Sequence, residues 1–194
     1  PTLSYVLFQS EGNSLKMVAT DLEISVLTEV EIQGEEDGQL SVPAKKIGDL
    51  MRELGELEIS YKVDDSFSLM LKAGEGEYQV PGISAQEFPA LPDFEGAMEF
   101  TISAEKFSKL IQRSTFAVSK DELRPALTGV FFQLRPQEIR AVATDGHRLV
   151  RIIDQDFSFN GEPTELIIPV KALNMIQRNL PESGDVTVVL GENQ

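Results

Sequence analysis

The sequence has 194 residues, of which 41% are hydrophobic and 25% charged, which suits one large or two modest globular domains. It contains no cysteine and no apolar stretch near the ~18 residues of a membrane helix, which excludes disulfides, thiolate metal sites and helical membrane spans. From these features we expect a cytoplasmic protein. The formal net charge of −15 argues against a nucleic-acid partner, but DNA binding depends on where the 17 Lys and Arg residues lie.

An internal repeat organises the chain. Residues 1–21 read PTLSYVLFQSEGNSLKMVATD and residues 125–145 read PALTGVFFQLRPQEIRAVATD, with nine of 21 positions identical. Unrelated sequences would share about one or two, so the segment is duplicated. The likeness continues later, where VPAK at 42–45 corresponds to IPVK at 168–171. We therefore predict two similar domains, at 1–96 and 97–194.

Short alternating or β-branched runs predict the strands of both domains. In chain order, these strands are expected at Val6–Phe8, Ser14–Ala19, Ile24–Val30, Glu58–Val63, Phe67–Lys72, Glu77–Val80, Met98–Ile102, Gly129–Gln133, Glu138–Ala143 and Val186–Leu190. Turns are predicted at 11–13 and 135–136, where Gly and Pro interrupt the pattern.

Three helices are predicted between these strands. Two of them begin at Pro43 and Pro169, because proline suits the first helical turn, and a third spans 103–118 with Ser103 as its cap. Residues 90–96, ALPDFEG, are predicted to form the linker between the domains. Relative to each other, the first copy lacks a leading strand and helix and the second lacks closing strands. We therefore expect a longer natural chain, with a strand and helix before Pro1 and more strands after Gln194.

Positive charge is concentrated on the predicted helices. Lys106, Lys109 and Arg113 lie at i, i+3 and i+7, which places them on one stripe of a helix. Phe107, Leu110 and Ile111 form the opposing apolar stripe. The other two helices carry a Lys and an Arg seven residues apart at equivalent repeat positions: Lys45 and Arg52, and Lys171 and Arg178. Acidic residues gather instead in strands and turns. This split favours a helix layer that faces a polyanion, although lysine-rich helix surfaces that face only solvent are also common.

The segment AVATDGHRL at 141–149 is the specialised copy of MVATDL at 17–22, and it holds the only histidine. His147 could act as a base oriented by Asp145, which would make the protein a hydrolase. Neighbours two apart on a tight glycine turn rarely reach that geometry, and no nucleophile stands out. A turn stabilised by side chain to backbone hydrogen bonds is the simpler interpretation. One histidine without cysteine also argues against a zinc site.

These residues resemble a known family. The patterns PxL[ST]xVxFQ, VATDGHRL, IPVKAL and NLPESGDVTV are similar to those of the bacterial sliding clamps, the beta subunits of DNA polymerase III. The resemblance implies an α+β DNA-clamp fold with repeated domains, each having two helices on the inside and antiparallel sheets outside. It also implies a non-catalytic processivity factor without cofactors, in which two subunits of three domains close into a ring around duplex DNA. The chain would cover most of the first and second domains, and the third would be absent.

The family resemblance also implies site residues. Those expected to meet DNA phosphates in the hole of the ring are Lys45, Arg52, Lys106, Lys109, Arg113, Lys171 and Arg178. Those expected to form one wall of the pocket for polymerase and clamp-loader peptides are Leu127, Thr144, Gly146, His147, Arg148 and Leu149. Those expected at the contact with the neighbouring subunit are Leu50, Leu54 and Tyr78. The alternatives left open are a hydrolase centred on Asp145 and His147, and a β-rich scaffold that does not bind DNA.

Overall fold

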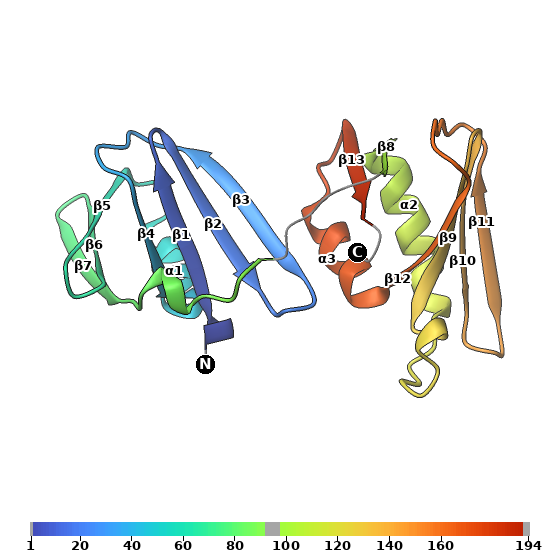
Figure 1. Cartoon of the computed structure of the whole chain (residues 1–194), viewed down its shortest axis with the longest axis horizontal. Coiled ribbons are helices and arrows are strands. Elements are labelled where there is room, and N and C mark those ends of the chain that lie inside the picture. Colours follow the sequence, from blue (N-terminus) through green and yellow to red (C-terminus); the bar gives the residue numbers. More distant parts are fainter. Residues whose placement is uncertain (1, 92–97, 192–194) are drawn as a thin grey trace. The chain divides into compact units, whose positions relative to one another are not determined.

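The computed structural model describes residues 2–91 and 98–191 of the chain (Figure 1). It divides into two compact units, Pro1–Pro92 and Asp93–Gln194, and each is described by itself. The predicted linker at 90–96 lies mostly outside the described residues.

The first unit contains two antiparallel sheets and one α-helix within its described residues. Its elements are β1 (Tyr5–Glu11), β2 (Ser14–Thr20), β3 (Ser25–Glu31), β4 (Gly38–Pro43), α1 (Ala44–Leu54), β5 (Ile59–Val63), β6 (Ser68–Ala73) and β7 (Gly76–Pro81). The first sheet has the order β3-β2-β1-β4, and the second has the order β5-β6-β7.

The second unit has the same arrangement of its main sheet, preceded by a further strand and helix. Its elements are β8 (Met98–Ser103), α2 (Ala104–Ser114), β9 (Gly129–Arg135), β10 (Glu138–Thr144), β11 (Leu149–Asp154), β12 (Thr164–Pro169), α3 (Val170–Asn179) and β13 (Asp185–Leu190). The order β11-β10-β9-β12 repeats that of the first unit, and β13 pairs with β8. The duplication seen in sequence is therefore a duplication of topology.

The predicted elements are confirmed with small shifts at their ends. Pro43 and Pro169 are the last residues of strands and occupy the N-cap positions of α1 and α3. Each has an extended ψ angle, so neither belongs to the helix that follows it. Ser103 caps α2 as expected, and its Oγ accepts a hydrogen bond from the N–H of Lys106 at 3.3 Å. The helix predicted to reach residue 118 ends at Ser114, and a 3-10 turn, η3 (Thr115–Ala117), follows.

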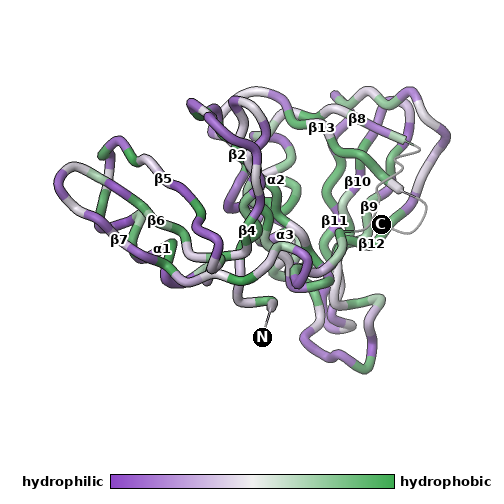
Figure 2. The backbone as a smooth tube through the Cα atoms, turned by 60° about the vertical axis from the view of Figure 1, so that its left-hand side comes forward, coloured by the Kyte–Doolittle hydropathy of each residue, from purple (hydrophilic) through white to green (hydrophobic). Residues whose placement is uncertain are grey.

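Alternating residues of the main sheet build the core of the second unit. Phe107, Leu110 and Ile111 of α2 are at most 2% exposed and pack against buried residues of β9 and β10. Phe107 meets Phe132 of β9 edge to face, with ring centroids 6.3 Å apart. Figure 2 shows the same division, with hydrophobic stretches inside the strands and mostly hydrophilic turns between them. The apolar stripe predicted for α2 is thus confirmed.

The first unit leaves the corresponding sheet face less covered. In the second unit, Ala141 and Ala143 of β10 lie beneath α2 and are at most 3% exposed. Their counterparts Met17 and Ala19 are half-buried, and the neighbouring Val26 of β3 is 38% exposed. Among residues 2–91, no helix occupies the position of α2. Within residues 2–91 and 98–191, the two copies therefore share their strand pairing.

The last segment of the first unit packs on the other face of the first sheet. Phe88 is 8% exposed and packs with Leu7 and Val18 in a small cluster of its own. The segment leading to it forms a bridge to β4, in which the backbone groups of Ser41 and Ile83 exchange two hydrogen bonds.

Candidate functional site

The turn between β10 and β11 is held by two side chains that bond to its own backbone. Thr144 Oγ1 donates to the carbonyl of Arg148 at 2.6 Å and accepts from the N–H of Gly146 at 3.1 Å. Asp145 Oδ1 accepts from the N–H groups of His147 and Arg148, each at 3.0 Å. Gly146 has a φ of +90°, a conformation that glycine adopts without strain. The sequence TDGHR therefore specifies a rigid turn that displays the side chains of residues 147–149.

The same turn occurs in the first unit between β2 and β3. Thr20 Oγ1 bonds to the carbonyl of Ile24 and the N–H of Leu22, as its counterpart Thr144 does. Asp21 Oδ1 accepts from the N–H groups of Glu23 and Ile24 at 3.1 and 2.9 Å. Leu22 takes the glycine position with a φ of +76°. Because the copy without histidine or glycine keeps every one of these bonds, the Thr-Asp pair has a structural role.

The carboxylate of Asp145 is fully engaged by this turn. Besides its two backbone bonds, it accepts a hydrogen bond from Arg148 Nε to Oδ2 at 2.9 Å. The N–H groups of His147 and Arg148, together with the Arg148 guanidinium, hold the pKa of Asp145 far below its usual 3.8. Asp145 meets residue 147 through the backbone N–H, and this differs from the Asp–imidazole pair that a hydrolase needs. The geometry therefore favours the turn and weakens the hydrolase alternative.

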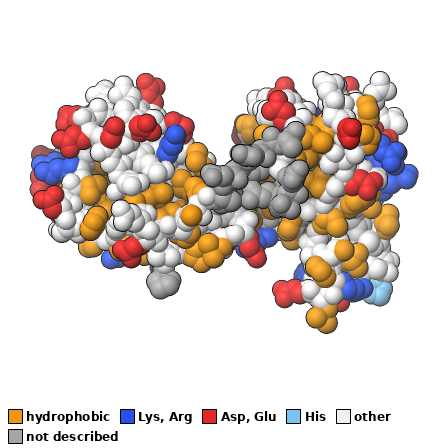
Figure 3. All heavy atoms as spheres, in the orientation of Figure 1, with side chains coloured by type: hydrophobic (Ala, Val, Ile, Leu, Met, Phe, Trp, Pro, Cys, Tyr) orange, Lys and Arg blue, Asp and Glu red, His pale blue; other side chains and the backbone are white. Residues whose placement is uncertain are grey.

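The surface around the turn combines apolar and basic groups. Leu149 is 67% exposed, and the histidine and Arg148 are also exposed, whereas Thr144 and Leu127 are half-buried. Figure 3 shows blue, pale blue and orange side chains together at the lower end of the second unit. The structure therefore brings the six predicted peptide-site residues to one end of the sheet, at the end of β10, in the β10–β11 turn, at the start of β11 and in the 3-10 turn before β9.

Sequence reasoning missed three residues on this surface. Phe116 is 59% exposed and lies under the guanidinium of Arg148, with Cζ 5.9 Å from the ring centroid. Arg124 approaches the glycine, since its Nη1 lies 3.5 Å from where a Cβ on Gly146 would be. Leu123, next to Arg124, is 92% exposed. The sequence shows these residue types shortly before the second copy of the repeat, but it shows neither their exposure nor their proximity to the turn.

The predicted basic stripe on α2 is largely paired with acids. Lys106 Nζ lies 2.8 Å from a carboxylate oxygen of Asp156 and 2.6 Å from its carbonyl oxygen, and 3.6 Å from the carboxylate of Asp154. The hydrogen bond to Asp156 raises the pKa of Lys106 above its usual 10.5. Lys109 forms an ion pair with Glu105 one turn earlier. Within the described residues Arg113 has no ion pair, so the stripe presents one unpaired cation instead of three.

The other two helices also expose cations. On α1, Lys45 is exposed, and Arg52 is exposed but forms an ion pair with Asp49 at 2.8 Å. On α3, Lys171 and Arg178 are both exposed. The predicted basic residues therefore do reach the surface of all three helices, although acids of the same or a neighbouring element neutralise part of their charge.

The three residues predicted to contact another subunit differ in exposure. Leu54 is 8% exposed, and Leu50 is partly buried against the first core of Leu40, Val42 and their neighbours. Tyr78 is 36% exposed on β7. Leu54 therefore packs mainly inside its own unit, because the last turn of an amphipathic helix directs its leucine to the core, and it has little surface left for a neighbour.

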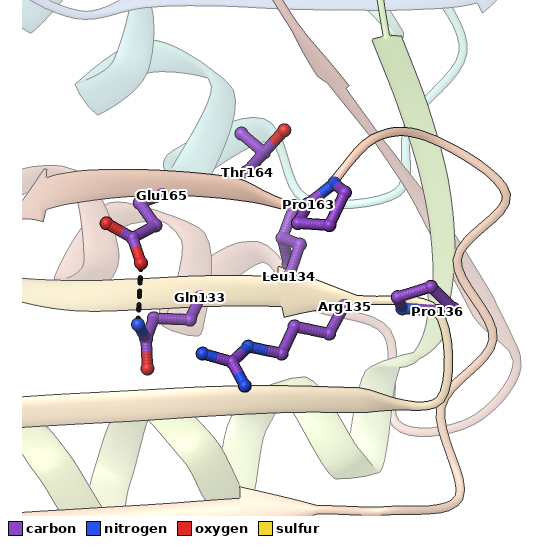
Figure 4. A pocket seen from close by; sticks show the side chains of 7 residues that line it. All are labelled: Gln133, Leu134, Arg135, Pro136, Pro163, Thr164 and Glu165. Carbon is purple, nitrogen blue, oxygen red and sulfur yellow. Dashed lines mark hydrogen bonds between the residues drawn. The ribbon is translucent and has the colours of Figure 1, made fainter.

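A shallow hollow of about 290 Å3 lies apart from these residues, between β9 and β12 (Figure 4). Across it the amide nitrogen of Gln133 donates to Glu165 at 2.7 Å. None of the predicted site residues lines this hollow. Over the described residues, no group of three or more His, Asp or Glu side chains could hold a metal ion, and no helix has the length and apolarity to cross a membrane.

Comparison with protein families gives two adjacent matches. Residues 1–92 match the family model of the DNA polymerase III beta subunit N-terminal domain, and residues 101–194 match that of its central domain. The two matches follow each other in the order that the family resemblance implied.

Individual relatives give the same result. A protein named beta sliding clamp from Chlamydia muridarum is 33% identical over the whole chain, and one from Pseudomonas aeruginosa is 32% identical. The chain spans about half the length of the curated relatives it matches, 53% in both cases.

Solved structures have the same fold. A DNA polymerase sliding clamp from Pseudomonas aeruginosa, with ligand, is matched over 99% of this chain and 53% of the clamp, with a TM-score of 0.92 and 32% identity. A sliding clamp from Bartonella birtlesii bound to griselimycin is matched with a TM-score of 0.90 and 33% identity over the same shares.

Proposed function

This chain belongs to the DNA polymerase III beta subunit family, and on that premise we propose that it forms part of a sliding clamp, a ring that encircles duplex DNA and tethers the replicative polymerase. The observation that carries the proposal is the likeness to a solved sliding clamp over 99% of the chain at a TM-score of 0.92. The role needs no chemical step, in keeping with the structural use of Asp145. It would be performed in the cytoplasm of a bacterium by a closed homodimer of the complete protein.

DNA contact is proposed for the exposed cations of the three helices. Arg113, Lys45 and Arg178 are the strongest candidates, because they are exposed and have no ion pair among the described residues. Such contacts bind phosphates of any sequence, which a sliding protein requires. The acidic strands and turns would repel DNA from the other surfaces.

Partner binding is proposed for the surface around the β10–β11 turn. Leu149 and Leu127 offer apolar anchorage for a short peptide of the polymerase or the clamp loader. Gly146 lets a peptide backbone come close, and Arg148 offers hydrogen-bond donors beside it. A solved Bartonella birtlesii clamp is bound to griselimycin, and we expect griselimycin to bind this chain at the surface around the β10–β11 turn.

A hybrid ring tests topological binding. The chain replaces the matching half of the Pseudomonas aeruginosa clamp, and the hybrid is loaded onto nicked circular DNA by that organism's clamp loader, with the parent clamp as control. We expect long retention on the circle and rapid loss once the DNA is cut. Equal retention on circular and linear DNA would indicate ordinary surface binding and contradict the proposal.

The peptide site is tested on the chain alone. Its single histidine gives one set of imidazole proton signals, which report directly on the turn. We expect griselimycin to shift these signals and the amide signals of residues 144–149 in a saturable way. The matched control is the first-unit turn at 20–25, which has the same backbone bonds and should not shift. A titration that perturbs neither turn would contradict the assignment.

A further inference from the structure

An exposed phenylalanine beside the β10–β11 turn has no role in the core. Phe116 is 59% exposed, although α2 and the residues that follow it are otherwise well packed. Burial of a phenylalanine side chain usually stabilises the folded protein. Exposure of most of this ring therefore calls for an explanation at the surface.

The backbone that carries Phe116 is held on both sides. Ser114 and Ala117 are fully buried, and Ser114 Oγ donates to the carbonyl of Leu110 at 2.6 Å. After the 3-10 turn, the N–H of Ser119 donates to the carbonyl of Leu127 at 2.8 Å. The ring is thus projected from a short rigid segment, anchored by buried neighbours at positions 114 and 117.

The ring of Phe116 lies beside the guanidinium of Arg148, which is also hydrogen-bonded to Asp145. Arg148 Nε donates to Asp145 Oδ2 at 2.9 Å, and Arg148 Cζ is 5.9 Å from the centroid of Phe116. This distance is within the range of a cation–π contact. Both backbone polar groups of Arg148 are also bonded within the turn. Among the described residues, none pairs with its two Nη groups, so these donors are available to a ligand.

We propose that Phe116 is a positioning residue of the partner-peptide site, which fixes Arg148 so that its Nη groups meet an oxygen acceptor of the bound peptide. This inference rests on the proposed function. The peptide places an apolar side chain against Leu149, and a backbone carbonyl or carboxylate oxygen meets Arg148. A guanidinium that is held before binding loses less rotamer freedom when the peptide arrives, which raises affinity.

The first unit supplies an internal contrast. Its turn has the same backbone bonds, but Ile24 occupies the arginine position. The backbone bonds of the turn therefore form without an arginine at this position.

A double-mutant cycle tests the proposal, with griselimycin as the probe and binding followed by nuclear magnetic resonance. Phe116→Leu should weaken binding about twofold to fivefold, the range expected for an exposed cation–π contact, and Phe116→Tyr should restore it because tyrosine keeps the ring face. In an Arg148→Ala background, Phe116→Leu should have no further effect. Equal losses in both backgrounds, or a Tyr variant as weak as the Leu variant, would overturn the proposal.

Two further measurements separate positioning from loss of structure. The Arg148 Nε–H signal should move downfield in Phe116→Leu, since the ring no longer shields it, while thermal unfolding changes little. Phe67→Leu makes the same exchange at a phenylalanine of the first unit that is 47% exposed, and should leave binding unchanged. If the unmodified chain does not bind griselimycin, the peptide-site proposal itself fails; if it binds without coupling between Phe116 and Arg148, only this inference fails.

Discussion

Two cations on the same helix should differ in their contribution to DNA binding. Lys106 and Arg113 were both predicted to meet phosphates, yet Lys106 Nζ is bonded to the carboxylate and carbonyl of Asp156 and lies 3.6 Å from Asp154. With two carboxylates around one ammonium, this cluster carries a net charge of −1, which does not attract a phosphate. Arg113 has no ion pair within the described residues. We therefore expect only Arg113 to exchange its counterions for a phosphate.

The size of the effect follows from counterion release. Loss of one phosphate contact makes the slope of log affinity against log salt less steep by about 0.9. When salt rises from ~50 to ~200 mM, the affinity of such a variant should therefore fall by a factor about 3.5 times smaller than that of the unmodified chain. Arg113→Ala should show this change, and Lys106→Ala should leave the slope almost unaltered. Fluorescence anisotropy of a labelled duplex, measured over that salt range, gives both slopes.

Circular dichroism controls for folding, because Lys106→Ala also frees Asp154 and Asp156. Equal reductions of the slope by both variants would show that the ion pairs do not withhold Lys106 from DNA. That result would refute the argument from pairing.

Three other predictions concern the turns and the first core. Gly146→Ala should lower the free energy of unfolding by about 1 kcal/mol, because alanine is strained at a φ of +90°. Leu22→Gly in the equivalent turn should not lower it. Chemical denaturation measures both changes, and an equal loss of stability in the two variants would contradict the strain argument. Phe88→Ala should lower the free energy of unfolding of the first unit by about 3 kcal/mol, because it leaves a cavity in the cluster on the first sheet. The first unit should then unfold at a lower denaturant concentration. A loss under about 1 kcal/mol would show that the segment carrying Phe88 is not anchored by this cluster. Asp145→Asn should destabilise the second unit at neutral pH but not in acid. The pKa of Asp145 is lowered by folding, so its contribution is fully present above the unfolded value near 3.8 and declines as the pH falls from there through the lower folded-state pKa. A difference between the two proteins that does not decline over this range would contradict the argument.

Local patterns were sufficient for most of the secondary structure. In the two main sheets, alternating or β-branched runs indicated β1, β2, β3, β9 and β10, whereas β4, β11 and β12 were not predicted. The turn at 144–149 was indicated by glycine after a Thr-Asp pair that recurs at 20–21. These features depend on residues close together in the chain, so the sequence contains the information that determines them. The end of α2 was overestimated by four residues, because Ser114 bonds back to the helix carbonyls and a 3-10 turn continues the same helical pattern.

Charge was harder to predict than hydrophobicity. The helical spacing placed Lys106, Lys109 and Arg113 on one stripe, and the apolar stripe opposite them is buried as expected. The partner of Lys106 lies 50 residues away in the loop after β11, and no periodicity reports a contact of that kind. The subunit contact of Leu54 was implied by the family resemblance and stays a prediction, and the structure adds that this leucine is 8% exposed within its own unit.

The sequence by itself determined the duplication, the turns and the family, because repeated side-chain patterns and backbone turn bonds act over a few residues. Only the tertiary structure decided which charges are neutralised, which leucines are buried and that Phe116 lies beneath Arg148. Those outcomes depend on pairs brought together by sheet and helix packing, where the energy of a contact is set by distance and burial and not by separation along the chain.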